Sequence, residues 1–221
     1  GSQIDPIPLR YIRQIPNISG VVTSLMDMPA GALWPAERIQ ALKEEVQAAG
    51  LEMEVIESVN IHEDIKLGLP SRDAYIDNYR NTVRLLGQAG VKVICYNFMP
   101  VFDWTRTDLA KPRPDGSTVL AYDQSVIDRI TDPQAFADQI QQGAGEFEMA
   151  GWEPERMTEL KSLFAQYKQV SHEDLFANLE YFLKAVIPVC EECGVTMAIH
   201  PDDPPWDIFG LPRIYTGREN M

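Results

Sequence analysis

The run Val195-Thr196-Met197-Ala198-Ile199-His200-Pro201-Asp202-Asp203-Pro204-Pro205 decides the fold class. Its first five residues are mostly apolar, and they end at a histidine, two aspartates and three prolines, a pattern typical of a short strand buried on both faces. Such strands belong to parallel sheets, which bind ligands at their carboxyl ends. We therefore expect His200 to point into a functional site, with the carboxylates of Asp202 and Asp203 held in a proline-fixed loop.

A repeated junction of helix, glycine and strand extends this prediction to the rest of the chain. It occurs at Ala49-Gly50-Leu51, Ala89-Gly90-Val91 and Cys193-Gly194-Val195, where each glycine can end a helix in the left-handed conformation. With a first strand at 20–25, the pattern predicts four parallel strands, the others at 51–58, 91–98 and 195–199. The polar residues Glu57, Asn97 and His200 follow the glycines at nearly equal distances. Since parallel strands end at one edge of a sheet, these three are predicted to surround one cavity.

Residues 103–170 do not fit the repeat. We interpret them as a mainly helical insertion after the third strand, within a single α/β domain spanning 1–221. Turn residues fill 111–116, an extended piece is predicted at 117–122, and Pro133 and Pro154 precede helices predicted at 134–141 and 155–169. An insertion of this length on the catalytic side commonly acts as a lid or an interface.

Composition limits the classes of function. The net charge of −14 disfavours nucleic acid and anionic membranes as partners, because their phosphates would be repelled. No apolar run is long enough to span a bilayer, and the start lacks a signal pattern, so we expect a cytoplasmic location. Three cysteines argue against a disulfide framework. Cys190 and Cys193 have redox-like spacing but close a helix, which favours a packing role over redox or zinc chemistry.

Each candidate residue also has a purely structural interpretation. His200 is either a ligand or catalytic residue, or a satisfied core histidine, and His62 is either functional or a surface loop residue. Glu57 and Asn97 either recognise hydroxyl groups beside a metal or only cap strand ends. Arg106 either binds a carboxylate or braces the insertion. The residues alone leave these alternatives open.

Several long segments are similar to the mannonate dehydratase family. They are Glu57-Ser58-Val59-Asn60-Ile61-His62-Glu63-Asp64-Ile65-Lys66, the run from Cys95 to Asp108, Ile199-His200-Pro201-Asp202-Asp203-Pro204-Pro205 and Gly210-Leu211-Pro212-Arg213-Ile214. The resemblance implies a (β/α)8 TIM barrel of the xylose-isomerase-like type, of which about four βα units are present. It also implies Mn²⁺- or Fe²⁺-dependent removal of water from D-mannonate to give 2-keto-3-deoxy-D-gluconate, in the cytoplasmic breakdown of hexuronates such as glucuronate.

The resemblance also implies roles for individual residues. His200 corresponds to a metal ligand of the family, whose other ligands come from later strands that this sequence does not contain. His62, Asn97 and Arg106 are the catalytic candidates. Glu57, Asp202 and Asp203 are the substrate-binding candidates. With so few ligands, residues 1–221 alone are predicted to hold no well-ordered Mn²⁺ or Fe²⁺.

Two alternative functions remain open at this level. One is a sugar isomerase or epimerase of the same barrel type, and the other is a catalytically incomplete piece that acts only in interactions. Four parallel strands cannot close a barrel, so the strand at 195–199 would present an unpaired edge. We therefore expect more chain or a second subunit against that edge, and a homo-oligomer of two or more copies.

Overall fold

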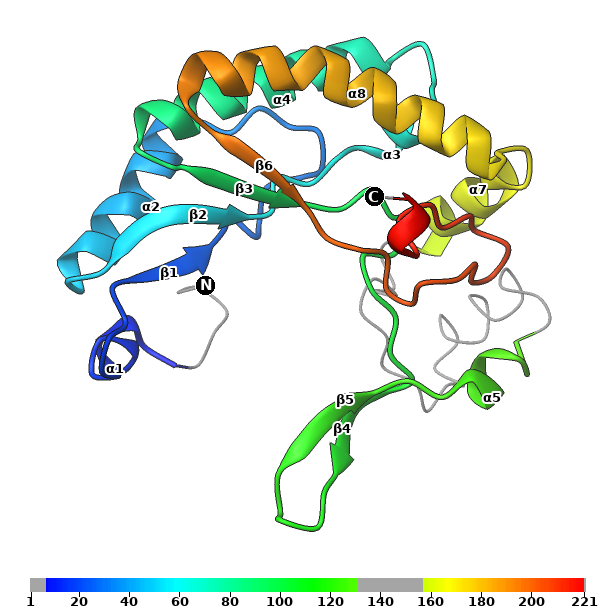
Figure 1. The fold of residues 1–221 in the computed structure, drawn as a ribbon, viewed down its shortest axis with the longest axis horizontal. Helices are drawn as coiled ribbons and strands as arrows, with labels where there is room; N and C mark the ends of the chain where they lie inside the picture. Colours follow the sequence, from blue (N-terminus) through cyan, green and yellow to red (C-terminus); the bar gives the residue numbers. More distant parts are fainter. Residues whose placement is uncertain (1–6, 131–156, 221) are drawn as a thin grey trace. The chain divides into compact units, whose positions relative to one another are not determined.

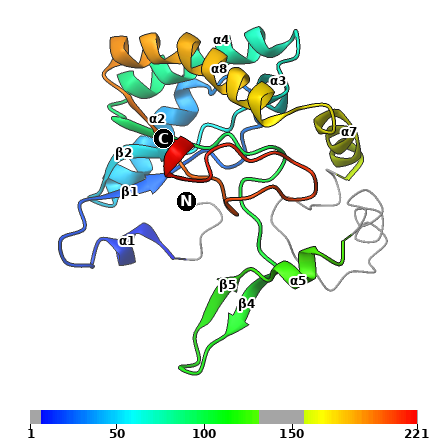
Figure 2. The ribbon, with the colours of Figure 1, turned by 45° about the vertical axis from the view of Figure 1, so that its right-hand side comes forward.

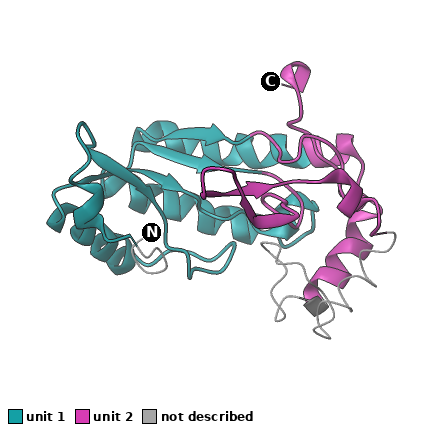
Figure 3. Cartoon of the chain, turned by 90° about the horizontal axis from the view of Figure 1, so that it is seen from below, with its two compact units in different colours: residues 1–97, 177–200 teal, residues 98–176, 201–221 magenta. Residues whose placement is uncertain are grey.

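The computed structural model describes residues 7–130 and 157–220. It has two compact units, Gly1–Asn97 with Ala177–His200, and Phe98–Phe176 with Pro201–Met221, which we call unit 1 and unit 2 (Figure 3). The strands are β1 (Gly20–Thr23), β2 (Glu52–Glu57), β3 (Val93–Tyr96), β4 (Asp108–Pro112), β5 (Thr118–Ala121) and β6 (Thr196–Ile199). The helices are α1 (Leu9–Ile12), α2 (Ala36–Ala48), α3 (Glu63–Lys66), α4 (Arg72–Gln88), α5 (Gln124–Ile127), α7 (Met157–Tyr167), α8 (His172–Cys193) and the short 3₁₀ helix η2 (Arg218–Asn220).

Unit 1 is built on a four-stranded sheet in the order β1-β2-β3-β6, in which every neighbouring pair is parallel (Figure 1). All four strands lie within or at the ranges predicted from the sequence. The glycine at each repeated junction has a positive φ, for example +65° at Gly194, as a left-handed helix end requires. The α/β class with a parallel sheet is thus confirmed for the described residues.

Helices α2, α4 and the part of α8 in unit 1 cover one face of the sheet (Figures 1 and 2). Apolar residues at helical spacing line the buried side of these helices, for example Ile39, Leu42 and Val46 on α2. The ring of Phe182 from α8 packs edge-on against Tyr79 of α4 at 5.0 Å between centroids, and lies 6.4 Å from the ring of Tyr96 on β3. This layer is the core of unit 1.

The opposite face of the sheet is much less covered. Alternation and register assign to it the side chains of Val22, Val55, Val93, Cys95 and Ala198, which we call the open face. Val22 is 53% exposed and the other four are half-buried, whereas Ile56 and Ile94, on the helix-covered face, are completely buried. Among the described residues, no layer of side chains fully covers this face of the sheet.

The strand at 195–199 is less buried than its sequence predicted. We expected burial on both faces, yet Thr196 is exposed and Met197, Ala198 and Ile199 are half-buried. Within the described ranges β6 pairs only with β3, so it is an edge strand with helices on one face alone. The predicted unpaired edge is confirmed for this part of the chain, and the predicted full burial is wrong because the layer that would provide it is absent there.

Helix α8 begins with a capping box formed by Ser171 and Asp174. The Ser171 amide donates to Oδ2 of Asp174 at 3.0 Å, and the Asp174 amide donates to Oγ of Ser171 at 3.1 Å. The helix then continues to Cys193 through Pro188, which lies inside it. The reciprocal pair satisfies two amides that a helix start would otherwise leave without partners.

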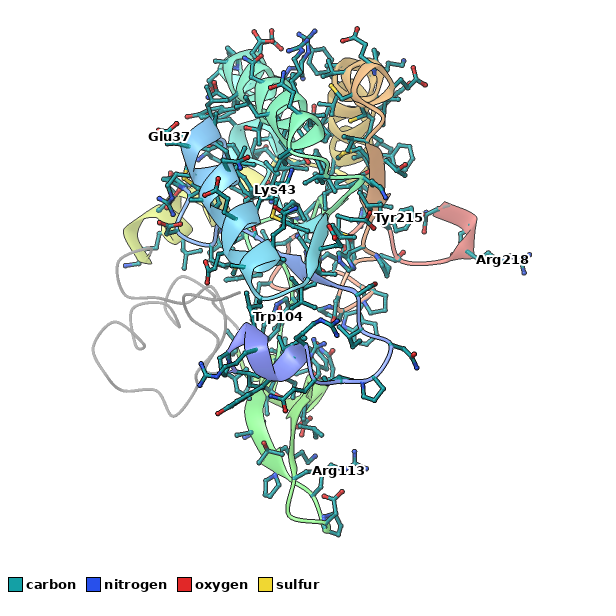
Figure 4. The ribbon with its side chains drawn as sticks, turned by 90° about the vertical axis from the view of Figure 1, so that its left-hand side faces the viewer. Glu37, Lys43, Trp104, Arg113, Tyr215 and Arg218 are labelled. Carbon is teal, nitrogen blue, oxygen red and sulfur yellow. The ribbon has the colours of Figure 1, made fainter. Side chains whose placement is uncertain are left out.

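Unit 2 contains the antiparallel hairpin of β4 and β5, and Arg113 lies in the turn that joins them (Figure 4). The extended piece at 117–122 and the turn before it are confirmed. Strand β4 was not predicted, because its charged residues and Pro112 do not give a strand pattern. Helix α7 confirms the helix predicted at 155–169 where it is described, and the one predicted at 134–141 lies outside the described residues. The apolar centre of the unit includes the rings of Phe102, Phe164 and Phe209.

Unit 2 also includes residues 201–221, which the sequence did not predict to pack with the insertion at 103–170. Asp202, in this segment, is 4% exposed, and its Oδ2 accepts the amides of Ile214 and Tyr215 at 2.7 and 3.1 Å. These bonds fold the segment back on itself. Among the described residues, no helix is both long and apolar enough to cross a membrane.

The difference between the two faces of the sheet predicts unequal effects of matched substitutions. Ile94→Ala removes a completely buried side chain and should lower the free energy of unfolding by about 2–5 kcal/mol. Val22→Ala on the open face should change it by about 0.5 kcal/mol or less. Urea unfolding followed by circular dichroism measures both. Equal losses at the two positions would contradict the assignment of the faces.

The exposed edge of β6 and the open face predict self-association of the 221-residue chain. An edge strand beside exposed apolar residues favours pairing with a second chain, because both burial and the free backbone groups are then satisfied. Sedimentation of this chain at tens of micromolar should show dimers, larger species or aggregation. A stable, soluble monomer under these conditions would contradict the incomplete-barrel interpretation.

Candidate active site

Three predicted residues lie at the same edge of the unit 1 sheet. Glu57 is the last residue of β2, Asn97 follows β3 directly and His200 follows β6 directly. Because these strands are parallel, their carboxyl ends meet there, and the backbone amide of His200 continues the ladder by donating to the Tyr96 carbonyl at 2.8 Å. The prediction that all three share one end of the sheet is confirmed.

Glu57 and His200 are in direct contact. Nε2 of His200 lies 2.6 Å from Oε1 of Glu57, and the two side chains are 47% and 45% exposed. The contact joins residues 143 positions apart, and both side chains keep an accessible side where a small ligand can approach. A carboxylate bonded to an imidazole nitrogen fixes the orientation of the ring, as is common for catalytic and metal-binding histidines.

Cys95, which is not among the site residues predicted from the sequence, lies beside this pair. Cys95 is the register partner of Glu57, so both side chains lie on the open face. Glu57 and Asn97 lie equally far after Gly50 and Gly90, which suggested that they would be neighbours in the sheet. Neighbouring parallel strands are staggered, however, and Val55, five residues after Gly50, pairs with Val93, three residues after Gly90. Strand alternation could have revealed Cys95, since it lies two residues before Asn97 and shares its side of the strand.

The surroundings of Cys95 keep its thiol protonated. Partial burial raises the pKa of Cys95, and the nearby carboxylate of Glu57 raises it further, because both disfavour a second negative charge. Without a cation, the group of Cys95, Glu57 and His200 therefore has its sulfur as a thiol. A bound divalent cation would reverse the balance by favouring the thiolate.

The residues at this edge fit part of a transition-metal site. One donor atom each from Glu57, Cys95 and His200 lie within 4.8 Å of one another, and no other such group of three occurs among the described side chains. Imidazole and carboxylate suit Mn²⁺ and Fe²⁺, while a thiol suits softer ions. Three donors are fewer than such ions usually take, so a complete site needs further ligands.

His62 is held firmly at the start of α3. Its Nδ1 accepts the amide of Asp64 at 3.1 Å, and its ring stacks on Tyr75 with centroids 3.7 Å apart and planes 9° apart. Gly31 packs beside this stack, where a Cβ would come within 2.5 Å of the Tyr75 ring. Since Nδ1 is an acceptor, the neutral ring carries its proton on Nε2. His62 is thus a positioned helix cap rather than a loose loop residue.

Arg106 and Asp203 form a second contact, within unit 2. The two Nη atoms of Arg106 donate to the two carboxylate oxygens of Asp203 at 2.9 and 2.6 Å, and the guanidinium lies 5.5 Å from the centre of the Trp104 ring. The bidentate pair raises the pKa of Arg106, because it favours the charged guanidinium. Arg106 thus holds a carboxylate in bidentate geometry.

The structure thus sorts the predicted residues into two groups. Glu57, His62, Asn97 and His200 belong to unit 1, where Glu57 and His200 touch, and Arg106, Asp202 and Asp203 belong to unit 2. Asn97 is half-buried. Unit 2 also has an open cavity of about 550 Å³, lined by residues that include His172, Trp206 and Asp207. None of the predicted site residues lines that cavity, so its size alone is a poor guide to the chemistry.

Comparison with known proteins identifies the family of this chain. The family model described as D-mannonate dehydratase (UxuA) matches residues 1–221. The chain belongs to this family. It is 58% identical over all 221 residues to a mannonate dehydratase of Geobacillus thermodenitrificans (strain NG80-2), covering 59% of that protein. It is also 58% identical to one of Thermotoga neapolitana, covering 61% of that protein.

A solved member of the mannonate dehydratase family has the same fold over the region compared. The crystal structure of mannonate dehydratase from Streptococcus suis serotype 2 matches 99% of this chain, with a TM-score of 0.82 and 51% sequence identity, and the match covers 56% of that chain. The chain thus spans about three fifths of the length of the curated relatives it matches.

Cys190 and Cys193 lie in the last turns of α8 and do not belong to the group of Glu57, Cys95 and His200. Cys190 is a buried packing thiol. Burial is the main cause that raises the pKa of Cys190 to about 11, and the neighbouring Cys193 and Glu191 contribute. A pKa two units above the ordinary value of 9.0 leaves about a hundredfold less thiolate at neutral pH.

Cys190 should therefore resist alkylation in the folded protein. Treatment with iodoacetamide at neutral pH should modify Cys190 about a hundredfold more slowly in the native chain than in urea, because only the thiolate reacts. Half-buried Cys193 serves as the internal control and should react faster than Cys190. Peptide mass spectrometry measures both. Similar native rates for the two cysteines would favour an exposed redox motif instead.

Proposed function

We propose that the complete protein is a mannonate dehydratase, a hydro-lyase that removes water from D-mannonate to give 2-keto-3-deoxy-D-gluconate. The observation that carries the proposal is the match of all 221 residues to the family model. The contact between Glu57 and His200 at the carboxyl edge of a parallel sheet supports it, because that edge is where α/β folds hold their ligands. Hexuronate breakdown in the cytoplasm is the role that this activity would serve.

The proposed architecture is a (β/α)8 barrel of the xylose-isomerase-like type. We interpret residues 1–221 as one incomplete barrel domain of about four βα units, with residues 103–170 as an insertion. Two features of unit 1 support this interpretation: the unpaired edge of β6 and the partly exposed apolar side chains of the open face. In a closed barrel, both would be covered by further strands and by the residues that fill the interior.

The reaction is a β-elimination. A base takes the proton from C2, which lies next to the substrate carboxylate, and an acid protonates the hydroxyl that leaves C3. A bound Mn²⁺ or Fe²⁺ would supply positive charge to stabilise the anion formed at the carboxylate and C2. His200 would hold that cation, and Glu57 would keep the His200 imidazole oriented through their 2.6 Å contact.

The remaining unit 1 candidates suit hydrogen bonding to the substrate hydroxyls. His62 carries its proton on Nε2, so it can donate to a departing or neighbouring hydroxyl, and its stack on Tyr75 keeps the ring in place. Asn97 offers an amide at the same edge of the sheet. Glu57, at the end of β2, would bind substrate hydroxyls with the carboxylate oxygen that His200 does not use.

In unit 2, we propose Arg106 as the group that binds the substrate carboxylate. Asp203 fixes its guanidinium by two hydrogen bonds, and would either share the arginine with the substrate or yield it on binding. Asp202 has a different role. Its buried carboxylate holds the backbone of residues 214 and 215, which makes it a supporting residue rather than a direct contact for substrate.

We further propose that the partners are a small sugar acid and further copies of the same protein. The net charge of −14 opposes binding to nucleic acid or to an anionic membrane surface, and it also raises the need for local cations where an acidic substrate binds. The exposed β6 edge and open face support an assembly with more polypeptide, either the rest of a longer chain or a second copy.

The activity is tested with the whole protein that carries this sequence, D-mannonate and Mn²⁺, with detection of a 2-keto-3-deoxy acid. His200→Gln should lower kcat/KM at least about a hundredfold, because it removes the proposed cation ligand. His172→Gln is the matched control: His172 is exposed, pairs with Asp207 and has no proposed catalytic role, so the rate should stay near the original.

The alternatives give different results in the same experiment. Isomerised or epimerised sugars without a keto-deoxy product would indicate an isomerase or epimerase of the same barrel type. An intact mass near 24.9 kDa with no turnover would indicate a catalytically incomplete piece that serves only in interactions. Equal loss of activity in the His200 and His172 variants would contradict the proposed site.

A further inference from the structure

We infer that Arg106 binds the substrate carboxylate through Nε–H and one Nη2–H, while Asp203 keeps its two hydrogen bonds to the same guanidinium. Asp203 is then a positioning residue that stays in place when the substrate binds. The inference rests on the proposed function for the identity of the anion, and it decides between sharing and displacement at Arg106. All of the groups that carry it belong to unit 2.

The guanidinium of Arg106 uses only part of its hydrogen-bonding capacity. A guanidinium has five N–H donors in one plane, and a carboxylate can bind end-on to both Nη atoms or side-on to Nε and Nη2. Asp203 takes the end-on pair, with Nη1 to Oδ1 at 2.9 Å and Nη2 to Oδ2 at 2.6 Å. The other Nη1 hydrogen is donated to the Thr105 carbonyl at 2.8 Å. The side-on pair of donors therefore remains.

The side-on donors of Arg106 are accessible to a ligand. Among the described residues, none accepts a hydrogen bond from Nε, and Nε is not one of the buried polar atoms that lack a partner. The side chain as a whole is 22% exposed. A carboxylate that binds there replaces water and breaks no contact within the protein. Because Arg106 and Asp203 together are neutral, these donors supply orientation more than net charge.

Asp203 is anchored by its backbone as well as by its carboxylate. The backbones of Trp104 and Asp203 pair in an isolated parallel bridge, and the Asp203 amide donates to Sδ of Met99 at 3.3 Å. These contacts hold the Asp203 carboxylate beside Arg106 whether or not a ligand is present. Displacing it would break two charge-assisted hydrogen bonds, whereas side-on binding breaks none. Sharing is therefore favoured over displacement.

An arginine held in this way selects for a carboxylate. Two parallel N–H groups match the two oxygens of a planar carboxylate, and the match depends on the angle at which the guanidinium is held. D-mannitol has hydroxyls like those of D-mannonate but a hydroxymethyl group in place of the carboxylate. It offers one neutral oxygen at that position, so it cannot satisfy both donors. Asp203 thus contributes to specificity through the orientation of Arg106.

Steady-state kinetics of the whole protein distinguish positioning from competition. If Asp203 positions Arg106, Asp203→Ala lets the guanidinium rotate and should raise KM for D-mannonate about tenfold, with kcat near its original value. If Asp203 competes with the substrate, the same variant frees Arg106 and KM should fall. Asp115→Ala is the matched control, because it removes a carboxylate from the exposed turn of the hairpin, and KM should not change.

A nuclear magnetic resonance titration tests the same donors without turnover. The Nε–H signal of Arg106 is the one that Arg106→Lys removes from the spectrum of the whole protein. Sodium acetate should shift this signal to a plateau, and D-mannitol should not shift it. Asp203→Ala should require about tenfold more acetate for the same shift. Arg113→Lys, in the hairpin turn, is the control and should leave the titration unchanged. Circular dichroism verifies that each variant is folded.

Three results would overturn the inference: a lower KM in Asp203→Ala, an unchanged KM in that variant, or an Arg106 Nε–H signal that acetate does not shift. Its failure is distinguishable from failure of the proposed function. A protein that forms the keto-deoxy acid but shows any of these three results retains the function and loses the inference. A protein that forms no keto-deoxy acid, yet shows an acetate shift that depends on Asp203, retains the anion site and refutes the dehydratase assignment.

Discussion

The parallel hydrogen-bond ladder of β2, β3 and β6 is the constraint on which the candidate site depends. The ladder places Glu57 and His200, which are 143 positions apart in the sequence, on either side of β3, where their side chains meet at 2.6 Å. The helices stabilise the ladder from one side, through residues such as Ile94 and Phe182 that are fully buried. The chemistry at the edge is thus positioned by packing several residues away from it.

The same sheet is the reason for proposing that further polypeptide packs against this chain. A parallel sheet is stable in water when both faces are covered, yet here the helices cover one face and Val22 on the other is 53% exposed. The chain matches about three fifths of its relatives' length. The unpaired edge of β6 and the partly exposed open face, on which Cys95 also lies, are the features that further βα units would cover.

In unit 2, polar and aromatic contacts hold the loops in place. Asp202 accepts two backbone amides, Arg106 and Asp203 form a bidentate pair, and the rings of Phe102, Phe164 and Phe209 pack together. The Arg106–Asp203 pair and the ring contacts of Phe209 join the two segments of the unit, 98–176 and 201–221. The Asp203 carboxylate shows that the Arg106 guanidinium can bind an anion. A substrate carboxylate would have to share the guanidinium with Asp203 or compete with Asp203 for it.

The sequence by itself determined the α/β class, the four strands, the covering helices and the shared edge of Glu57, Asn97 and His200, because periodicity and glycine helix ends are local signals. Only the tertiary structure decided which residues touch. Strand stagger replaced Asn97 by Cys95 as the register partner of Glu57, and the edge position of β6 removed the expected burial. The pairing of Arg106 with Asp203 was likewise invisible to the sequence. Register and side-chain pairing depend on contacts between distant segments, and no local pattern encodes them.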